Sequence, residues 1–369
     1  MAHNNDDKNY SEYFKSLENR INRENNVPEK CRKDKRTAKK KCKFYKVFRL
    51  NKPLLMLASV FFIILIIAIT VLTHKNSTEA LPKNSEKSKV SYSAPSAKEH
   101  LISYKFTNNT AQIPESNDAS GAIIVNLDTH TAAAAREPHA RLYPASTTKI
   151  MTLLVAVENI KNYDDTFTMT REITDPLYVA EATVAGFSVD EKINMTDLLY
   201  GTILPSGGDA AMGLAVKLAG SEENFVKLMN KKATDLGLKD THFTNVTGLY
   251  NADHYTSAYD MAIILETAYN NPICKKVLST YQYTTSPTDK HPNGIELSAT
   301  LFNYMYGTEP ETATIEGGKT GFVNESGYCI ATFGSNNTSG ERYIAVTLKN
   351  SSRWPAFYGQ IDLYKQFAE

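Results

Sequence analysis

The chain has 369 residues, of which 42% are hydrophobic and 22% are charged, so it is long enough to bury the core of one large or two medium domains. Of its 41 basic and 40 acidic residues, 16 and 7 lie in residues 1–52, which leaves 25 and 33 in the remainder. The four cysteines form no C-x-x-C pair, which excludes the usual pattern of a metal or redox site, and we expect no metal and no cofactor.

Residues 53–73 are the first predicted element, an apolar run of 21 positions without a charge. At about 1.5 Å of rise per residue, this run spans the roughly 30 Å of a bilayer's hydrocarbon core. A cleavable signal peptide is the alternative, but the leader and the apolar core are both too long for one. Because the basic residues precede the run, we predict a single-pass type II transmembrane helix in the cell membrane, with a cytoplasmic N-terminus.

The basic segment 1–52 has two candidate partners, nucleic acid and anionic lipid. Its position directly before the apolar run favours lipid contact and a role in topology, and we expect no nucleic acid partner. Residues 74–100 are rich in Ser, Lys, Glu and Pro and almost lack large apolar side chains, which is typical of a linker. The remaining residues, 101–369, form the predicted extracytoplasmic domain.

Within this domain, residues 120–129 are a predicted strand, and residues 146–160 a predicted helix with one buried stripe that includes Ile150 and Leu153. Further helical patterns cover residues 195–204, 209–219, 222–237, 259–271 and about 356–367, and strand-like patterns cover 327–333 and 342–350. Strands at both ends of the domain enclose a block of helices. This order predicts an α+β fold, an antiparallel sheet flanked by helices, rather than alternating βαβ units.

Two cysteines lie in this domain. Cys329 falls in a strand-like segment, where a buried free thiol is expected, and a disulfide between Cys274 and Cys329 is the alternative.

Ser146 and Lys149 lie three positions apart at the start of the predicted helix, so their side chains project from one face. A neutral lysine amine in a partly desolvated site can take the proton of a serine hydroxyl and make the oxygen a nucleophile. A helix N-terminus also stabilises negative charge near Ser146. The alternative is a structural role, with Ser146 as an N-cap and Lys149 as a solvated first-turn residue. The S-x-x-K pattern taken alone favours this structural role.

Two later motifs change this balance. Ser206, Gly207 and Gly208 form a turn before a predicted helix, and the sequence Lys-Thr-Gly at 319–321 precedes a strand-like segment. In isolation, Ser206 would be a helix-capping serine and Lys319 a surface lysine at a strand end. The order S-x-x-K, S-x-G/N, K-T-G is instead typical of active-site serine enzymes that recognise penicillin. Asp209, next to the second motif, is expected to be a helix N-terminal charge.

On these motifs and the stretches around them, at 143–158, 198–211, 236–262 and 315–332, the sequence resembles the D-alanyl-D-alanine carboxypeptidase family. These are low-molecular-mass penicillin-binding proteins of the serine peptidase S11 type, and the resemblance covers about residues 120–368. It implies a β-lactamase/transpeptidase-like fold and removal of the terminal D-alanine from peptidoglycan stem pentapeptides. It also implies β-lactam antibiotics as inhibitors.

The resemblance further implies roles for three side chains. Ser146 would attack the carbonyl of the penultimate D-alanine and hold the acyl-enzyme, with Lys149 as its base. Ser206 would sit across the cleft and relay a proton toward the leaving amine.

The third motif would then bind the substrate. Lys319 would supply positive charge for the relay and the substrate carboxylate, and Thr320 would hydrogen-bond that carboxylate. Gly321 belongs to the same substrate-binding strand. The backbone N–H groups of Ser146 and Phe322 would form the oxyanion hole, a contribution of several kcal/mol in such sites.

Gly208 departs from the family pattern, in which the second motif usually ends in an asparagine whose amide helps to hold the acyl chain and the lysine. Loss of that hydrogen bond would cost roughly 1.5–3 kcal/mol, about tenfold to a hundredfold in rate. Gly208 is therefore expected to affect the efficiency of the enzyme and its choice of substrate more than the type of reaction. The family also usually has a cleaved signal peptide and a C-terminal amphipathic anchor, and we expect the helix at 53–73 to replace the C-terminal anchor.

Two other functions share parts of the pattern. A β-lactamase would need a glutamate in an E-x-x-x-N loop, and Glu266 to Asn270 has that spacing, but its helical periodicity predicts a pair on a helix surface. A membrane-tethered penicillin-binding or sensory module with weak turnover is the second alternative, because Gly208 removes a customary contact.

Overall fold

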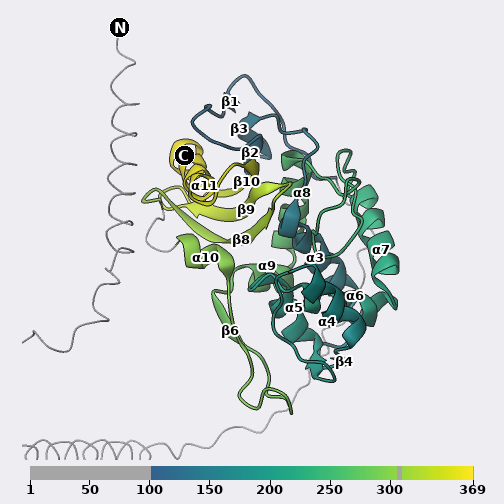
Figure 1. Cartoon of the computed structure of the whole chain (residues 1–369). Helices are drawn as coiled ribbons and strands as arrows, with labels where there is room; N and C mark the ends of the chain where they lie inside the picture. Colours follow the sequence, from purple (N-terminus) through teal and green to yellow (C-terminus); the bar gives the residue numbers. More distant parts are fainter. Residues whose placement is uncertain (1–100, 306–309, 369) are drawn as a thin grey trace, which may run out of the picture. The chain divides into compact units, whose positions relative to one another are not determined.

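A computed structural model of the chain describes residues 101–305 and 310–368 (Figure 1). The predicted basic segment, transmembrane helix and linker lie outside these residues, so they stay predictions. Within the two described ranges, no helix combines the length and apolar character that a membrane span needs.

The centre of the described part is a six-stranded sheet in the order β1-β3-β2-β10-β9-β8. The strands are β1 (Ala111–Gln112), β2 (Gly121–Asn126), β3 (Thr131–Arg136), β8 (Ala313–Val323), β9 (Gly327–Asn336) and β10 (Arg342–Asn350). Neighbours pair antiparallel except β1, which runs parallel to β3. The prediction of an antiparallel sheet is therefore correct for the five longer strands and wrong for the edge, where a two-residue strand joins.

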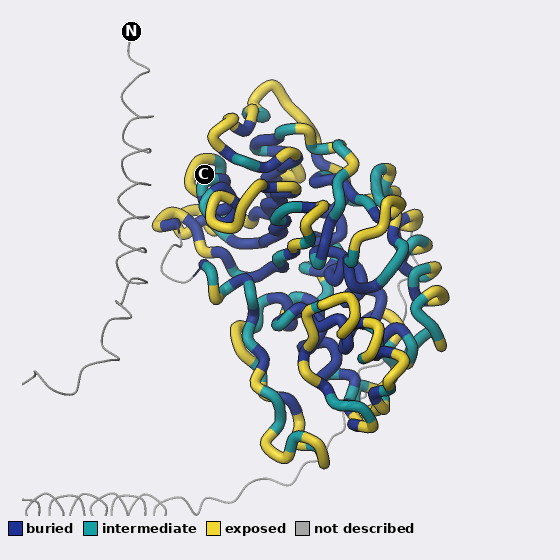
Figure 2. Tube along the Cα trace, viewed as in Figure 1, coloured by how far each residue is buried: buried dark blue, intermediate teal, exposed yellow. Residues whose placement is uncertain are grey.

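Each strand faces two hydrophobic cores, because successive side chains in a strand point to opposite faces. On β2, Ile123 and Val125 join the core shared with the helical block, whereas Ala122 and Ile124 join a second core. Helix α8 (Ala258–Asn270) covers the first face, and α10 (Thr300–Met305) and α11 (Arg353–Phe367) pack on the other (Figure 1). Figure 2 shows the central strands as buried along most of their length.

The helical block begins with a 3-10 turn, η2 (Ala145–Thr148), that leads directly into α3 (Lys149–Asn159). The other helices are α4 (Arg171–Val179), α5 (Met195–Ile203), α6 (Gly208–Ala219), α7 (Glu222–Asp235) and α9 (Pro272–Leu278). Two short ladders complete the described part: β4 (Thr166–Thr168) with β5 (Lys192–Asn194), and β6 (Gln282–Thr284) with β7 (Glu296–Ser298).

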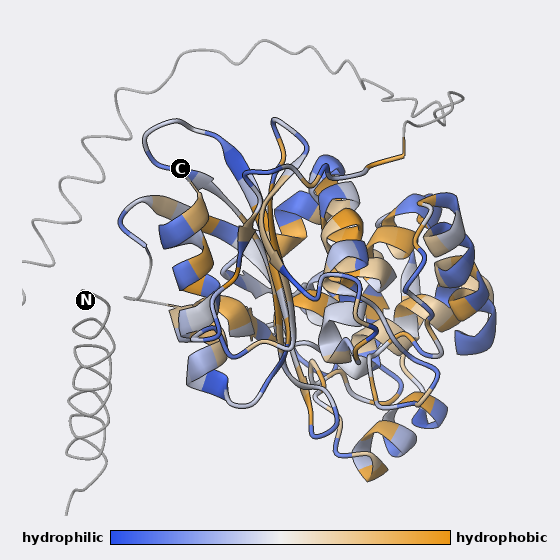
Figure 3. Cartoon of the chain, turned by 90° about the horizontal axis from the view of Figure 1, so that it is seen from above, coloured by the Kyte–Doolittle hydropathy of each residue, from blue (hydrophilic) through white to orange (hydrophobic). Residues whose placement is uncertain are grey.

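Helix α3 is the centre of this block. The sequence predicts one buried stripe, yet every residue from Lys149 to Val157 is buried. The prediction was wrong because α5, α6, α7 and α8 surround α3 on all sides, and a helix enclosed in this way is apolar all round. Figure 3 shows hydrophobic residues concentrated between the sheet and these helices.

Both cysteines of the described part, Cys274 and Cys329, are free and buried. This confirms the expected buried thiol at Cys329, and no disulfide joins the two.

Candidate active site

The first motif lies where η2 meets α3. Lys149 Nζ is 3.0 Å from Ser146 Oγ and donates a second hydrogen bond of 2.6 Å to the carbonyl oxygen of Thr247. The N-terminal caps of η2 and α3 have no side-chain hydrogen bond, and Lys149 is only 3% exposed. The structural alternative for this motif, an N-cap serine and a solvated lysine, is therefore wrong.

Burial also sets the protonation of Lys149. Desolvation lowers the pKa of its amine to about 7, and the negative charge of Asp209 offsets part of this effect. A large share of the amine is thus neutral near pH 7. When neutral, its lone pair lies within reach of the Ser146 hydroxyl proton, which is the geometry of a base beside its nucleophile.

The second motif faces this pair from the turn between α5 and α6. Ser206 has a left-handed backbone, with φ of 68°, and its side chain is 8% exposed. Its Oγ has no hydrogen-bond partner among the described residues. Helix α6 is capped by Gly207 without a side-chain bond, so the structural alternative for Ser206, a helix-capping serine, is wrong. A buried hydroxyl without a partner is uncommon and is typical of a group that bonds to a ligand.

The third motif lies within β8, although the sequence placed it before a strand. Lys319 is 2% exposed and its Nζ donates a 2.8 Å hydrogen bond to the carbonyl oxygen of Thr320, which contradicts a surface lysine. Burial, and then the charge of Lys149, lowers the pKa of Lys319. A protonated Lys149 thus disfavours protonation of Lys319.

Gly321 lets this strand lie directly against Ser146. A Cβ added at Gly321 would lie 2.7 Å from the backbone nitrogen of Ser146 and 3.0 Å from Ala145 Cβ. A side chain at this position would displace one or both segments. The absence of a side chain therefore lets β8 pass directly beside the Ser146 N–H.

These three motifs line one cleft of about 270 Å³. Its walls include the predicted site residues Ser146, Ser206, Thr320, Gly321 and Phe322, together with Thr183, Pro205, Thr300, Tyr304, Tyr328, Arg353 and Phe357. Lys149 and Lys319 do not line it, because they are buried behind Ser146 and Thr320. Gly208 also lies outside the lining, and its backbone nitrogen donates to the carbonyl oxygen of Thr183.

Several wall residues come from positions that no motif marks. The Arg353 guanidinium lies 4.8 Å from the ring centroid of Tyr304 and 5.9 Å from that of Tyr328, and Phe322 stacks on Tyr328 at 4.3 Å. Phe322 is 48% exposed, so it offers the cleft an aromatic side chain as well as the predicted backbone N–H. No local pattern in the sequence could have identified Arg353 or Tyr304, because only the fold brings them to this cleft.

Glu266 lies in α8, as predicted, but it is buried and not on the helix surface. Its Oε2 accepts a 2.7 Å hydrogen bond from the hydroxyl of Tyr104. Tyr104, which comes just after the first described residue in the sequence, and Glu266 are both buried. Glu266 does not line the cleft. The E-x-x-x-N spacing thus supplies no water-activating carboxylate beside Ser146.

A model of the D-alanyl-D-alanine carboxypeptidase family, peptidase family S11, matches residues 107–352. The chain belongs to this family. Among its relatives, the D-alanyl-D-alanine carboxypeptidase DacF of Bacillus subtilis is 33% identical over 243 residues, which are 64% of this chain and 58% of that protein. The D-alanyl-D-alanine carboxypeptidase of Streptomyces sp. strain K15 is 31% identical over 64% of this chain and 82% of its own length.

The comparison with solved structures finds proteins of the same kind. The crystal structure of the Streptomyces K15 DD-transpeptidase superposes with a TM-score of 0.61 at 29% identity, over 67% of this chain and 97% of that one. Penicillin-binding protein 5 of Haemophilus influenzae matches with a TM-score of 0.59 at 26% identity, over 69% and 70%. The described part therefore has the fold of the penicillin-binding DD-transpeptidases.

Proposed function

We propose that the chain is a serine-type D-Ala-D-Ala carboxypeptidase that removes the terminal D-alanine from peptidoglycan stem pentapeptides through an acyl-enzyme on Ser146. The observation that carries this proposal is the 3.0 Å approach of Lys149 Nζ to Ser146 Oγ in a cleft with Ser206 and the Lys319 strand. Membership of the family and the likeness to solved DD-transpeptidases support it.

Acylation begins with the neutral Lys149 amine, which takes the proton of the Ser146 hydroxyl while Oγ attacks the carbonyl carbon of the penultimate D-alanine. The carbonyl oxygen becomes an oxyanion, held by the N–H groups of Ser146 and Phe322. When this intermediate collapses, the bond to the terminal D-alanine breaks. The leaving amine takes a proton through Ser206, whose free hydroxyl lies on the opposite wall.

Substrate binding and deacylation complete the cycle. Lys319 and Thr320 bind the terminal carboxylate of the peptide. Water then attacks the ester carbonyl, releases the shortened stem peptide and returns a proton to Ser146 Oγ. A β-lactam enters by the same first step and forms the corresponding penicilloyl ester, so these antibiotics are inhibitors.

The test compares the full chain in detergent with its Ser146→Ala variant. Wild type is expected to release D-alanine from a pentapeptide and to form a penicillin adduct detectable by mass spectrometry, and Ser146→Ala is expected to do neither. Ser120→Ala, at an exposed serine far from the motifs in sequence, serves as the control. An adduct without D-alanine release would favour the binding or sensory module, and rapid turnover of penicillin would favour a β-lactamase.

For the part of the chain outside the described residues, we infer a type II membrane protein anchored by residues 53–73, with residues 101–369 as its extracytoplasmic domain. The apolar run and its basic flank support this arrangement. In fractionated cells, the full chain is expected in the membrane pellet, with residues 101–369 accessible to protease from outside. A full chain recovered in the soluble fraction would contradict the anchor.

A further inference from the structure

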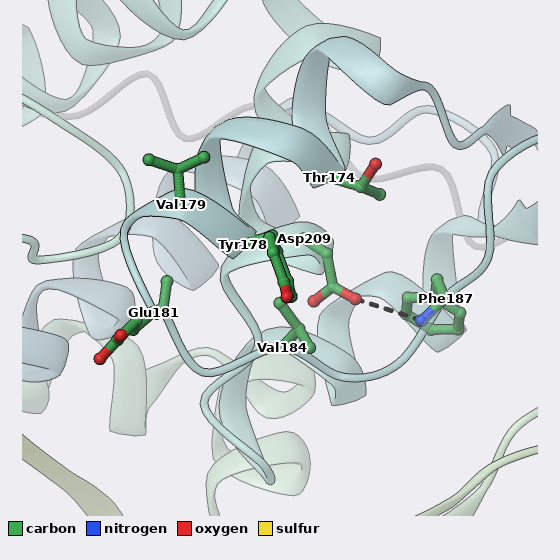
Figure 4. A pocket seen from close by; sticks show the side chains of 8 residues that line it. Thr174, Tyr178, Val179, Glu181, Val184, Phe187 and Asp209 are labelled. Atoms are coloured by element: carbon green, nitrogen blue, oxygen red, sulfur yellow. Dashed lines mark hydrogen bonds between the residues drawn. The ribbon is translucent and has the colours of Figure 1, made fainter.

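The loop at residues 180–187, after α4, belongs to none of the three motifs. It is held in place by residues at and next to the second motif. Asp209, which is 1% exposed, accepts three backbone hydrogen bonds from this loop: from Ala185 (2.7 Å), Gly186 (3.0 Å) and Phe187 (3.2 Å). Figure 4 shows the Asp209 carboxylate directed toward the nitrogen of Phe187. We call these three contacts the Asp209 clamp. The predicted helix-terminal charge thus also fixes the backbone of another segment.

The two glycines of the motif let this loop approach closely. A Cβ added at Gly207 would lie 2.8 Å from the nitrogen of Ala185, and one added at Gly208 would lie 3.1 Å from Leu177 Cδ2 and 3.3 Å from the carbonyl oxygen of Thr183. The nitrogen of Gly208 donates a 2.8 Å hydrogen bond to that oxygen. The space into which an asparagine side chain would first extend from position 208 is therefore occupied by Leu177 and Thr183.

Thr183 is placed by these contacts in the wall of the catalytic cleft. Thr183 is exposed and lines the cleft with Ser146 and Ser206, whereas its neighbour Val184 lines a second cavity of about 640 Å³ beside α4. Within the described part of the chain, its hydroxyl makes no hydrogen bond. A threonine hydroxyl can both donate and accept, which suits an amide group of a peptide.

We propose that Thr183 is a substrate-contacting residue that supplies the hydrogen bond which Gly208 lacks, and that Asp209 is the positioning residue that keeps Thr183 in the cleft wall. This inference rests on the proposed function and deepens it. The group recognised is the amide on the acyl side of the scissile bond, which in benzylpenicillin is the side-chain amide. A β-lactam without that amide, 6-aminopenicillanic acid, has only an amine at this position and offers the Thr183 hydroxyl no carbonyl oxygen.

The experiment measures the second-order rate of acylation of the full chain by both β-lactams, above pH 8 where Lys149 is neutral. Thr183→Val is expected to lower the rate with benzylpenicillin about three- to tenfold, as for loss of one neutral hydrogen bond, and to leave the rate with 6-aminopenicillanic acid within about twofold. Thr183→Ser, which keeps the hydroxyl, is expected to retain most of the benzylpenicillin rate. Thr174→Val, at a threonine that lines the other cavity, is the matched control.

Asp209→Asn tests the positioning role, because an amide cannot accept all three N–H groups. Its plateau rate is expected to fall more with benzylpenicillin than with 6-aminopenicillanic acid, as in Thr183→Val. Equal losses on both β-lactams, or no loss in Thr183→Val, would overturn the inference. A wild type that neither β-lactam acylates would instead overturn the proposed function, so the two failures are distinguishable.

Discussion

The two walls of the cleft differ in how far their polar groups are already paired. On the nucleophile's side, Lys149 bonds to Ser146 and Thr247, and Thr148 Oγ1 lies 2.8 Å from Nε2 of the buried His254. On the opposite side, the Ser206 hydroxyl has no hydrogen-bond partner among the residues that the structure describes, and Gly208 has no side chain. The first wall is therefore organised before substrate arrives, whereas the second has a hydroxyl free for the substrate.

The largest expected effect is that of Lys149→Met, which removes the base from the organised wall. Acylation by labelled penicillin is expected to fall about a thousandfold or more, because the Ser146 hydroxyl loses its proton acceptor. Melting of the variant should occur at or above the wild-type temperature, since a desolvated amine is replaced by an apolar side chain. Lys227→Met, at an exposed lysine, is the control. A loss below tenfold would show that another group takes the proton.

Gly321→Ala tests how tightly the organised wall is built. The added Cβ would meet the Ser146 nitrogen at 2.7 Å and displace an N–H of the oxyanion hole, so we expect acylation to fall about a hundredfold. In Gly340→Ala, the Cβ would meet nothing within 4 Å, and only stability should suffer, through a φ of 73°. Normal acylation in Gly321→Ala would mean that β8 can move away from Ser146 freely.

His254 contacts Thr148 in the same wall, and we expect it to affect the stability of the fold at acid pH. The N–H of Thr244 donates to Nδ1, so Nε2 carries the proton and donates to Thr148. Burial lowers the pKa of His254 to about 4, below its unperturbed value near 6.5. The folded protein thus binds fewer protons than the unfolded chain between these values. Its free energy of unfolding should fall as pH drops from about 6.5 to 4, by up to about 3 kcal/mol.

The measurement is denaturant unfolding across this pH range, with wild type beside His254→Gln and the exposed-histidine control His139→Gln. The His254 variant is expected to be less stable at pH 7 and to lose less stability on acidification, whereas the control should follow wild type. Parallel curves for all three proteins would show that His254 is not the group that titrates.

The pH profile of acylation is the next largest effect. Because we assign the neutral Lys149 amine as the base and its pKa is about 7, the rate should rise about tenfold per pH unit below 7 and level off above it. Single-turnover acylation by labelled penicillin between pH 5 and 9 measures this directly. A rate that stays constant from pH 6 to 8 would contradict the assignment of Lys149 as the base.

The smallest effect concerns the second wall. Gly208→Asn restores the family's usual residue, yet its Cβ would meet Leu177 Cδ2 at 3.1 Å and the Thr183 carbonyl oxygen at 3.3 Å. We expect acylation to fall a few-fold rather than rise, and Gly208→Ala to behave similarly because it shares the Cβ. An increase above wild type in Gly208→Asn would identify the amide as the missing group and would contradict the role of Thr183.

The three motifs could be identified, and most long helices predicted, from the sequence because both depend on local patterns. Helices α5 to α8 fall within about two residues of the predicted limits. The burial of Lys149 and Lys319 was not predictable, since it depends on neighbours distant in the chain. Glu266 was wrongly placed on a surface for the same reason: Tyr104, 162 residues earlier, covers it.

Other omissions have a different physical cause. Strand β3 consists largely of alanine, which has low strand propensity, and only its pairing with β2 makes it a strand. Thr183 carries no sequence signal at all, because its place in the cleft depends on a hydrogen bond from the Gly208 N–H and on the Asp209 carboxylate, which holds the rest of its loop. Residues of this kind become visible only when the packing is known.

Both walls also depend on an unfavourable backbone. Ala145, directly before the nucleophile, has φ of 47°, and Ser206 has φ of 68°, values that residues with a Cβ seldom adopt. Each such conformation costs about 1–3 kcal/mol, which the surrounding fold must offset. Selection of this protein for heat resistance alone would therefore favour glycine at these two positions, and at Ser206 the more durable protein would lack the hydroxyl to which we assign the proton relay.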